Sequence, residues 1–598
     1  MVEFKLNRNQ YLAVSSNHPR IACIAGPGTG KTRVLVQRVK RLLAEGHSPH
    51  EILVLTFTNK AAHEVRERLD SPKITAGTFH SVCYTWINRY LERFGEFRPY
   101  VPTIYDDADT TDIVKEVVEK FVFSYSQTKA RAILTAKYQD LIPNDEFTQS
   151  ERLFISAFEE AVINQGHALT YDQILYYVYQ KLSTDSFFQR EMQQYKYVFV
   201  DEYQDTNKIQ SELIKQLNPA NLFVVGDLDQ AIYAWRGAKL QELMNFANEP
   251  GTEKIFLNVS YRCRPAILQA AHNLIINNEI GFKEEILPSK EGVENAVQHT
   301  TFYNHQDELN SLLVDVASIQ DGKTLAVLTR TNREASDVSE LFKSKKIDHL
   351  LLTSENNLWG DFLVKNLMSY LKLVMNPKNG YSLFRAFREP ARDWYNARIK
   401  SELHLEALEK IQNIVDVAAV RFPYDIVFKY LETVNEDTPI VDAIQELYNL
   451  VKPSNYLPNK QDIFAQLQTR IEEWANKAED NRLKSFVRWM VFRDMQDALM
   501  TENAKVLVMT MHGAKGLEFD SVVIQNCVEG YLPIKNGDIE EERRLMYVAV
   551  TRAKDWLMLT DSEMIELPSY PGQVGVRVLN CIPSRFLHEM QIYEKQKA

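Results

Sequence analysis

Residues 21–32, which read IACIAGPGTGKT, decide the fold of this 598-residue chain. The first five are apolar, as in a short buried strand. The segment VLVQRVKRLLAEG then places apolar residues on one face of a helix that Gly46 would end. A glycine-rich turn between a strand and a helix is the setting of a phosphate-binding loop. The stretch therefore predicts a nucleotide site built on an α/β sheet.

The chemistry of this loop depends on its backbone and on two side chains. Glycines let backbone N–H groups turn toward phosphate oxygens, and the helix N-terminus adds positive potential. We expect Lys31 to reach the β- and γ-phosphates and Thr32 to ligate magnesium. The usual pattern begins with glycine where this chain has alanine. The predicted nucleotide-binding residues of the loop are Ala25, Gly26, Pro27, Gly28, Thr29, Gly30, Lys31, Thr32 and Arg33.

Short β-branched runs return along the chain and alternate with helical spacing, which favours parallel, doubly wound α/β sheets. Two long stretches lack such runs and read as helical. The simplest interpretation is two α/β cores, each interrupted by a mostly helical insertion. The predicted parts are a first core at 1–83 and 191–250 with an insertion at 84–190, and a second core at 251–356 and 496–598 with an insertion at 357–495.

Composition limits the classes of function. The chain has 69 Lys and Arg against 80 Asp and Glu, a net charge of −11, which argues against a polybasic binder but not against a local basic groove. Its five cysteines form no CxxC pair, so structural zinc and a disulfide framework are not expected. No apolar run approaches the ~18 residues of a membrane span. We therefore expect a cytoplasmic protein that makes no membrane contact.

An acidic pair follows another predicted strand. Residues 197–200 (YVFV) lead into Asp201 and Glu202, and the end of a buried strand suits a magnesium site. We expect Asp201 to hold the metal and Glu202 to act as general base toward water. Gln230, after a third strand, would sense the γ-phosphate. Alone, the pair is also typical of a solvated loop end and Gln230 of a helix cap, but the phosphate loop favours nucleotide hydrolysis.

Ten motifs, in order, resemble those of the UvrD/Rep/PcrA-like helicases of superfamily one. They are LNRNQ (6–10), AGPGTGKT (25–32), TFTNKAA (56–62), GTFHS (77–81), VDEYQDTN (200–207), VVGDLDQAIYAWRGA (224–238), NVSYRCRP (258–265), TLAVLTRTNREA (324–335), VLVMTMHGAKGLEFD (506–520) and EEERRLMYVAVTRAK (540–554). Many ATPases share the phosphate loop, whereas the run GDLDQAIYAWRGA and the pair of runs GAKGLEF and VAVTRA make the resemblance specific.

The resemblance implies two RecA-like cores with ATP and Mg²⁺ between them and single-stranded DNA across both. By position, Gln10 would read adenine, Tyr261 would stack on it, and Glu518 would contact the ribose. Gln230 would couple the γ-phosphate to DNA.

Arg262 and Arg552 would act, by the same resemblance, as arginine fingers from the second core. A guanidinium suits the charge spread over a transferred phosphoryl group, and its place on the other core makes hydrolysis depend on closure of the cleft. Without the family, Arg552 also fits an i,i+4 partner on a charged helix.

The resemblance also implies a DNA track of aromatic and basic side chains. Stacking is sequence-tolerant because every base has a π-face. Without the family, Phe57 and Tyr233 would be assigned to a core. The predicted stacking residues are Phe57, Tyr233 and Trp235, and the predicted backbone contacts are His80, Arg236, Arg330 and His512.

Two departures from the family pattern favour translocation without useful duplex unwinding. The second insertion lacks the GIG turn that in the family presents N–H groups to duplex phosphates. PSRFLHEM (583–590) resembles the closing segment of the family, so we expect no nuclease domain. Gly513 replaces a more usual serine or alanine.

The main hypothesis is an ATP-dependent 3′–5′ DNA helicase, monomeric by default, that acts on single-stranded DNA and single-strand/duplex junctions in repair, replication or recombination. The first alternative is a translocase with little unwinding, a motor subunit of a repair or phage-defence complex. The second alternative is a scaffold with a dead ATP site, and the complete set of catalytic residues argues against it.

Overall fold

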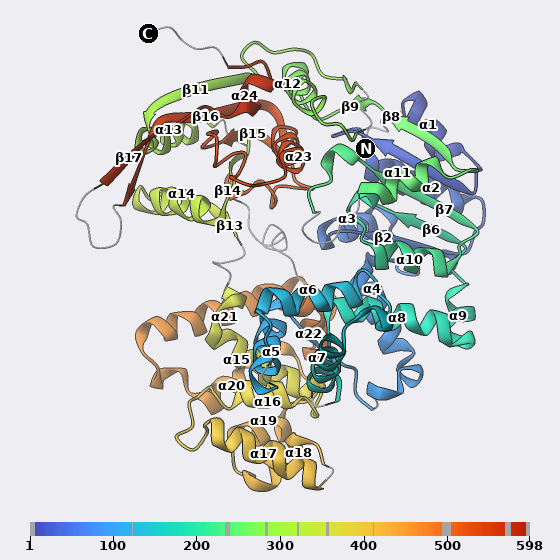
Figure 1. Ribbon diagram of the computed structural model, residues 1–598, viewed down its shortest axis with the longest axis vertical. Helices are drawn as coiled ribbons and strands as arrows, with labels where there is room; N and C mark the ends of the chain where they lie inside the picture. The colour runs from blue at the N-terminus through green and yellow to red at the C-terminus, as the bar shows by residue number, and fades with distance from the viewer. Residues whose placement is uncertain are drawn as a thin grey trace.

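The computed structural model shows two α/β cores side by side, with the helical insertions gathered beneath them (Figure 1). This arrangement confirms the predicted fold class. Among the residues that the structure describes, no helix has both the length and the apolar character that a membrane span needs. The structure describes residues 6–97, 99–121, 123–164, 166–233, 240–281, 285–319, 322–353, 358–410, 412–492, 504–568 and 576–593.

The first core is a six-stranded parallel sheet in the order β3-β2-β6-β7-β1-β8. Its central strands are buried on both faces, as in a doubly wound sheet. The strands are β1 (Arg20–Ala25), β2 (Ile52–Thr56), β3 (Thr75–Thr78), β6 (Tyr197–Val200), β7 (Asn221–Gly226) and β8 (Glu253–Leu257).

Helices cover both faces of this sheet. One face carries α1, α2 and α3, whose apolar residues pack on alternate strand residues such as Val54 and Val225. The opposite face carries α4, α10 and α11 and joins the first insertion in one continuous core. These helices are α1 (Arg8–Ser15), α2 (Lys31–Ala44), α3 (Asn59–Leu69), α4 (Phe79–Arg89), α10 (Lys208–Leu217) and α11 (Leu240–Asn248).

The predicted end of the helix after the phosphate loop is confirmed. Helix α2 ends in a Schellman motif, because Gly46 donates to the carbonyl of Leu43 at 3.1 Å and His47 to that of Leu42 at 3.1 Å. Gly46 has a φ of +92°, which a residue with a Cβ adopts only under strain.

The second core has the sheet order β11-β16-β15-β12-β14-β13, with every one of these pairs parallel. A final strand, β17, pairs antiparallel with the outer end of β16. The strands are β11 (Val297–Asn304), β12 (Leu325–Thr329), β13 (Leu350–Leu352), β14 (Val506–Thr510), β15 (Phe519–Ile524), β16 (Ala553–Pro568) and β17 (Val576–Asn580).

Two apolar clusters cover the faces of the second sheet. Helices α13 and α14 pack on one face, and α12, α23 and α24 on the other. The latter cluster also includes Tyr233 and, at its margin, Phe57, so the first core contributes to it. The helices are α12 (Pro265–Ile275), α13 (His305–Ala317), α14 (Asn332–Ser344), α23 (Ile539–Val550) and α24 (Arg585–Glu589).

The boundary between the cores differs from the expected one at residue 250. Strand β8 pairs in parallel with β1, with Cys23 opposite Ile255, so it forms the edge of the first sheet. The partner of this strand is fixed by a long-range pairing that no local pattern encodes.

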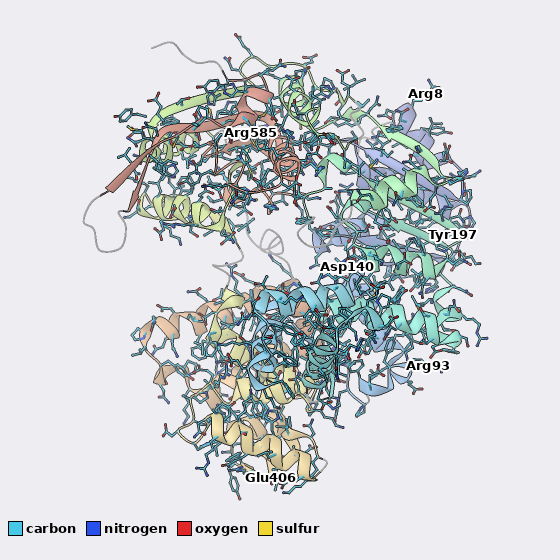
Figure 2. The ribbon with its side chains drawn as sticks, viewed as in Figure 1. Arg8, Arg93, Asp140, Tyr197, Glu406 and Arg585 are labelled. Carbon is cyan, nitrogen blue, oxygen red and sulfur yellow. The ribbon has the colours of Figure 1, made fainter. Side chains whose placement is uncertain are left out.

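The first insertion is helical apart from one short parallel pair, β4 (Thr103–Tyr105) and β5 (Ala168–Thr170). Asp140 lies where this insertion meets the first core (Figure 2). At the neighbouring residue, the backbone N–H of Ile209 on α10 donates to the carbonyl of Gln139 at 3.2 Å. The helices are α5 (Asp107–Lys120), α6 (Gln127–Tyr138), α7 (Gln149–Glu159), α8 (Tyr171–Thr184) and α9 (Ser186–Met192).

The second insertion has its own apolar core, and Glu406 marks its far end (Figure 2). It touches the first insertion through ion pairs: Arg385 reaches Asp109 at 3.0 Å, and Lys372 reaches the same carboxyl group at 3.3 Å. Its helices are α15 (Phe362–Met375), α16 (Gly380–Ala386), α17 (Ala397–Lys410), α18 (Ile414–Arg421), α19 (Ile426–Thr433), α20 (Ile440–Val451), α21 (Pro458–Lys477) and α22 (Leu483–Phe492).

Candidate active site between the two cores

The phosphate loop has the backbone that its glycines predict. Gly28 and Gly30 have φ values of +69° and +86° between the end of β1 and the start of α2. A Cβ at Gly28 would lie 2.4 Å from the Cβ of Arg262. Position 28 therefore requires a residue without a Cβ, because the second core approaches the loop closely here.

A cavity of about 480 Å³ opens between the cores at this loop, which is within the ~300–1,000 Å³ usual for small-molecule sites. Both cores line it. The first core contributes, among others, Pro27, Gly28, Thr29, Gly30, Lys31, Thr32, Arg33, Asp201, Glu202 and Gln230, and the second contributes Tyr261, Arg262, Lys515, Glu518, Arg552 and Lys554.

The acidic pair sits at the carboxyl end of β6. Asp201 is buried, and its Oδ1 accepts from the backbone N–H of Glu202 at 3.0 Å. Glu202 has a left-handed φ of +51°, unusual for a residue with a Cβ and commonest at functional sites. Its Oε2 lies 3.5 Å from the Lys31 ammonium. The strand end thus places both carboxylates in the lining of the cavity at the phosphate loop.

Their surroundings push the pKa values of the two carboxyl groups apart. Burial and the neighbouring Glu202 carboxylate raise the pKa of Asp201 to about 7. Burial alone would raise the pKa of Glu202 as well, but the cations Lys31 and Lys515 outweigh it and lower that pKa to about 2. Glu202 is therefore ionised at neutral pH, as a general base must be.

Gln230 and Arg552 join the two cores through a hydrogen bond. The Arg552 Nη2 donates to Gln230 Oε1 at 3.0 Å, and Gln230 Nε2 donates to Asp227 Oδ2 at 2.6 Å. Arg552 is almost wholly buried, and its other donors bind the carbonyls of Val548 and Leu517. Burial and the nearby Arg262 lower its pKa to about 10, so it stays a cation at neutral pH.

Arg262 and Glu518 form an ion pair at the mouth of the cavity, with Arg262 Nε donating to Glu518 Oε2 at 2.8 Å. The Lys554 ammonium lies 3.0 Å from the other oxygen of Glu518. The two cations lower the pKa of this half-buried carboxyl to about 2 against the effect of burial. Arg262 is thus held beside the phosphate loop by a residue of its own core.

Gln10 and Tyr261 lie next to the loop from opposite cores. Gln10 is buried, donates to the carbonyl of Thr29 at 2.9 Å and caps α1 through Asn7. The Tyr261 ring is 43% exposed, its hydroxyl accepts from Asn7 at 3.0 Å, and its N–H binds the carbonyl of Gly28. An exposed ring beside a buried amide suits a flat heterocycle, although the base contact itself stays a prediction.

Lys515 is a residue of this site that sequence reasoning missed. It lies in the MHGAKG motif of the second core, and its ammonium reaches Asp205 Oδ2 at 2.5 Å and the carbonyl of Gln230 at 2.6 Å. Both partners belong to the first core. The only signal in the sequence is a lysine inside a glycine-rich motif, which says nothing about a partner 310 positions away.

The predicted DNA-stacking residues Phe57 and Tyr233 stack on each other. Their ring centroids lie 5.0 Å apart at an interplanar angle of 23°, and both rings line the cavity near Lys515. Tyr233 is buried and Phe57 partly so. In this arrangement the space between the rings is too small for a base, so a stacking role requires them to separate. Trp235 and Arg236 lie outside the described residues.

The residues that we predict to contact the DNA backbone lie in different surroundings. His80, at the start of α4, packs edge-on against Tyr171, and burial lowers its pKa to about 4, so it is neutral at physiological pH. Arg330 is engaged by Glu542, whose two oxygens accept from its Nε and Nη2. His512 is half-buried just before Lys515. Contacts of these residues with DNA stay predictions.

The side chains of the site fit ATP and Mg²⁺. Thr32 and the buried Asp201 offer the hard oxygen donors that Mg²⁺ prefers, and Lys31 offers a cation to phosphate. Among the described residues, no cluster of three or more His, Cys, Asp or Glu residues could hold a metal.

A parallel P-loop core, joined to a second core that places an arginine at the same cleft, defines a two-core nucleotide-dependent motor. The chain matches the family described as the UvrD/REP helicase N-terminal domain over residues 6–251. It matches the UvrD-like helicase C-terminal domain over residues 255–564. The chain therefore belongs to the UvrD/Rep family of ATP-dependent DNA helicases, as its motifs predicted.

Similar proteins include two from staphylococci, both described as ATP-dependent DNA helicase PcrA. The protein of Staphylococcus epidermidis is 29% identical over 652 residues, which cover 98% of this chain and 86% of the relative. A Staphylococcus aureus protein is 30% identical over 648 residues with the same coverage. The similarity thus extends over both cores and both insertions.

Proposed function

We propose that this protein is an ATP-dependent motor that moves 3′ to 5′ along single-stranded DNA and unwinds the duplex ahead of it. The observation that carries the proposal is the hydrogen bond between Arg552 and Gln230, since it ties a catalytic arginine of one core to the nucleotide sensor of the other. Hydrolysis then depends on closure of the cleft, and closure moves the cores along the strand. The polarity rests on family membership.

The chain's own residues divide the work in the cleft. Lys31 and the loop N–H groups hold the phosphates, and Glu202 takes the proton of the attacking water. Arg262 and Arg552 stabilise the charge of the transferred phosphoryl group. Thr32 and Asp201 would hold Mg²⁺, which would supply positive charge against the phosphate oxygens.

The first test is ATP turnover with and without DNA. We expect a large stimulation, at least tenfold, by single-stranded oligonucleotides. Glu202→Gln should keep nucleotide and DNA binding but lower turnover by 10²–10⁴-fold, the usual contribution of a general base. Glu67→Gln on α3, which changes a side chain that is 66% exposed, is the matched control. Turnover that ignores DNA would contradict the motor.

Strand displacement on duplexes with a 3′ or a 5′ overhang tests the finer proposal. Displacement from the 3′ overhang alone supports a 3′–5′ helicase. Removal of a protein block from single strands without strand displacement would support the translocase alternative, which the missing GIG turn of the second insertion favours. A role in repair, replication or recombination and the cytoplasmic location stay predictions.

A further inference from the structure

Gln204 follows the acidic pair Asp201 and Glu202 in the chain and has no role in the proposed mechanism. It belongs to the 3₁₀ turn Tyr203–Asp205 that follows Glu202, and its side chain is fully buried. Its Nε2 donates to Glu202 Oε2 at 2.6 Å, and its Oε1 accepts from the backbone N–H of Asp227 at 2.9 Å. It therefore connects the end of β6 to the end of β7.

The orientation of this amide follows from its partners. A backbone N–H can only donate, so Asp227 requires the oxygen of the amide and leaves its nitrogen for Glu202. The neighbouring backbone also fixes the side chain, because a Cβ at Gly226 would lie 2.5 Å from Gln204 Oε1. The glycine at the end of β7 is thus the space into which the amide fits.

The hydrogen bonds continue beyond Asp227 to the second core. Asp227 Oδ2 accepts from Gln230 Nε2 at 2.6 Å, and Gln230 Oε1 accepts from Arg552 Nη2 at 3.0 Å. The side-chain amides of Gln204 and Gln230 both donate through their nitrogen and accept through their oxygen. Glu202 is therefore connected to the arginine on the other side of the cleft by hydrogen bonds of Gln204 and Gln230, which meet at the backbone N–H and the carboxylate of Asp227.

We propose that Gln204 is a positioning residue that holds the Glu202 carboxylate for catalysis and links its position to Arg552. The inference rests on the proposed function, in which Glu202 activates water. Glu202 needs such support because its backbone is in the left-handed region and its other near partner, Lys31, lies 3.5 Å away. Gln204 supplies a shorter bond that is independent of Lys31.

Gln204→Glu tests this role with the smallest change of shape. A carboxylate still accepts from Asp227 but cannot donate to Glu202 or to Asp205, whose Oδ2 lies 3.4 Å from Gln204 Nε2, and it repels both. We expect kcat of the DNA-stimulated ATPase to fall at least 30-fold, with KM for ATP and affinity for single-stranded DNA within twofold of the wild type. Gln204→Met, which removes all three hydrogen bonds at similar volume without adding a charge, should give a similar loss and covers the case in which the glutamate prevents folding.

Gln210→Glu is the matched control, since it makes the same change six residues further on. Gln210 Oε1 accepts from the Asn207 N–H in a capping box, where glutamate serves equally well. We expect wild-type turnover from this variant. Unchanged kcat in both Gln204 variants, beside an inactive Glu202→Gln, would overturn the positioning role while leaving the motor intact. A wild type without DNA-stimulated turnover would instead overturn the proposed function.

A double-mutant cycle with Arg552→Lys separates positioning from a merely structural role. If Gln204 acts through the series of hydrogen bonds, the losses in kcat caused by the two changes overlap, and the double variant is less impaired than their product. Independent losses that multiply would overturn the link to Arg552.

Discussion

The ammonium of Lys515 lies 2.5 Å from Asp205 Oδ2, so a lysine of the second core closes on the acidic loop of the first. The lysine side chain is 6% exposed and the aspartate side chain is not exposed at all. An ion pair this deeply buried stabilises little relative to apolar residues, but its loss leaves a charge without a partner.

Lys515→Met should therefore lower both stability and turnover. We expect the first thermal transition to fall in calorimetry, with a cost of about 3–5 kcal/mol for breaking a buried pair. Adding Asp205→Asn removes the stranded charge and should restore most of the stability but not the turnover. Equal melting of Lys515→Met and the wild type would show that the cores do not depend on this contact.

Tyr233→Ala tests whether the stacked rings serve DNA or only the core. If Phe57 and Tyr233 part to admit a base, the variant should lose about 1–3 kcal/mol of binding per stacked base. Fluorescence anisotropy with a labelled single strand measures this loss. Tyr424→Ala, at an 85% exposed ring of the second insertion, is the control. Unchanged affinity in Tyr233→Ala would assign the ring to packing.

Arg385→Ala should loosen the contact between the two insertions. The Arg385 guanidinium bridges Asp109 and Asp112 of α5 at 3.0 and 3.1 Å and is almost wholly buried. Its removal should speed hydrogen exchange in α5 and α16, the two helices that this contact joins. Arg398→Ala, on an 84% exposed side chain of α17, should leave both helices protected. Unaltered exchange in Arg385→Ala would show that apolar packing alone holds the insertions.

Asp315→Asn should change how stability depends on pH. Burial raises the pKa of this carboxyl group on α13 from 3.8 to about 6. A raised pKa favours the folded state at low pH, and this contribution is lost as pH rises through about 6. Above that pH the asparagine variant should be more stable, by roughly 1 kcal/mol after allowance for solvent screening, and near pH 4 the advantage should vanish. Denaturation at pH 4 and 8 measures it.

Much of the fold could be predicted because its signals are local. The loop at 25–32 lies between β1 and α2 as expected, and the runs at 197–200 and 506–510 coincide with β6 and β14. Burial on both faces makes such strands apolar throughout, which a sequence displays directly. The sheet to which β8 belongs could not be predicted in this way, because it depends on pairing with β1, which is distant in the sequence.

Motifs name the residues that we predict to be catalytic, whereas they do not name the partners of these residues. Glu202, Gln230 and Arg552 were each expected in the cleft. The role of Lys515 could not be predicted, because a buried cation can be identified only once its carboxylate partner is known. The ion pair of Arg330 with Glu542 was likewise not encoded in its motif, and the contact of Arg330 with DNA stays a prediction.

The sequence by itself determined the chemistry of this protein, because phosphate binding needs a glycine-rich loop and water activation needs a carboxylate at a strand end. The tertiary structure alone decided how these groups act together. Hydrogen bonds reach only about 3 Å, so the series from Glu202 through Gln204, Asp227 and Gln230 to Arg552 exists only where two cores meet.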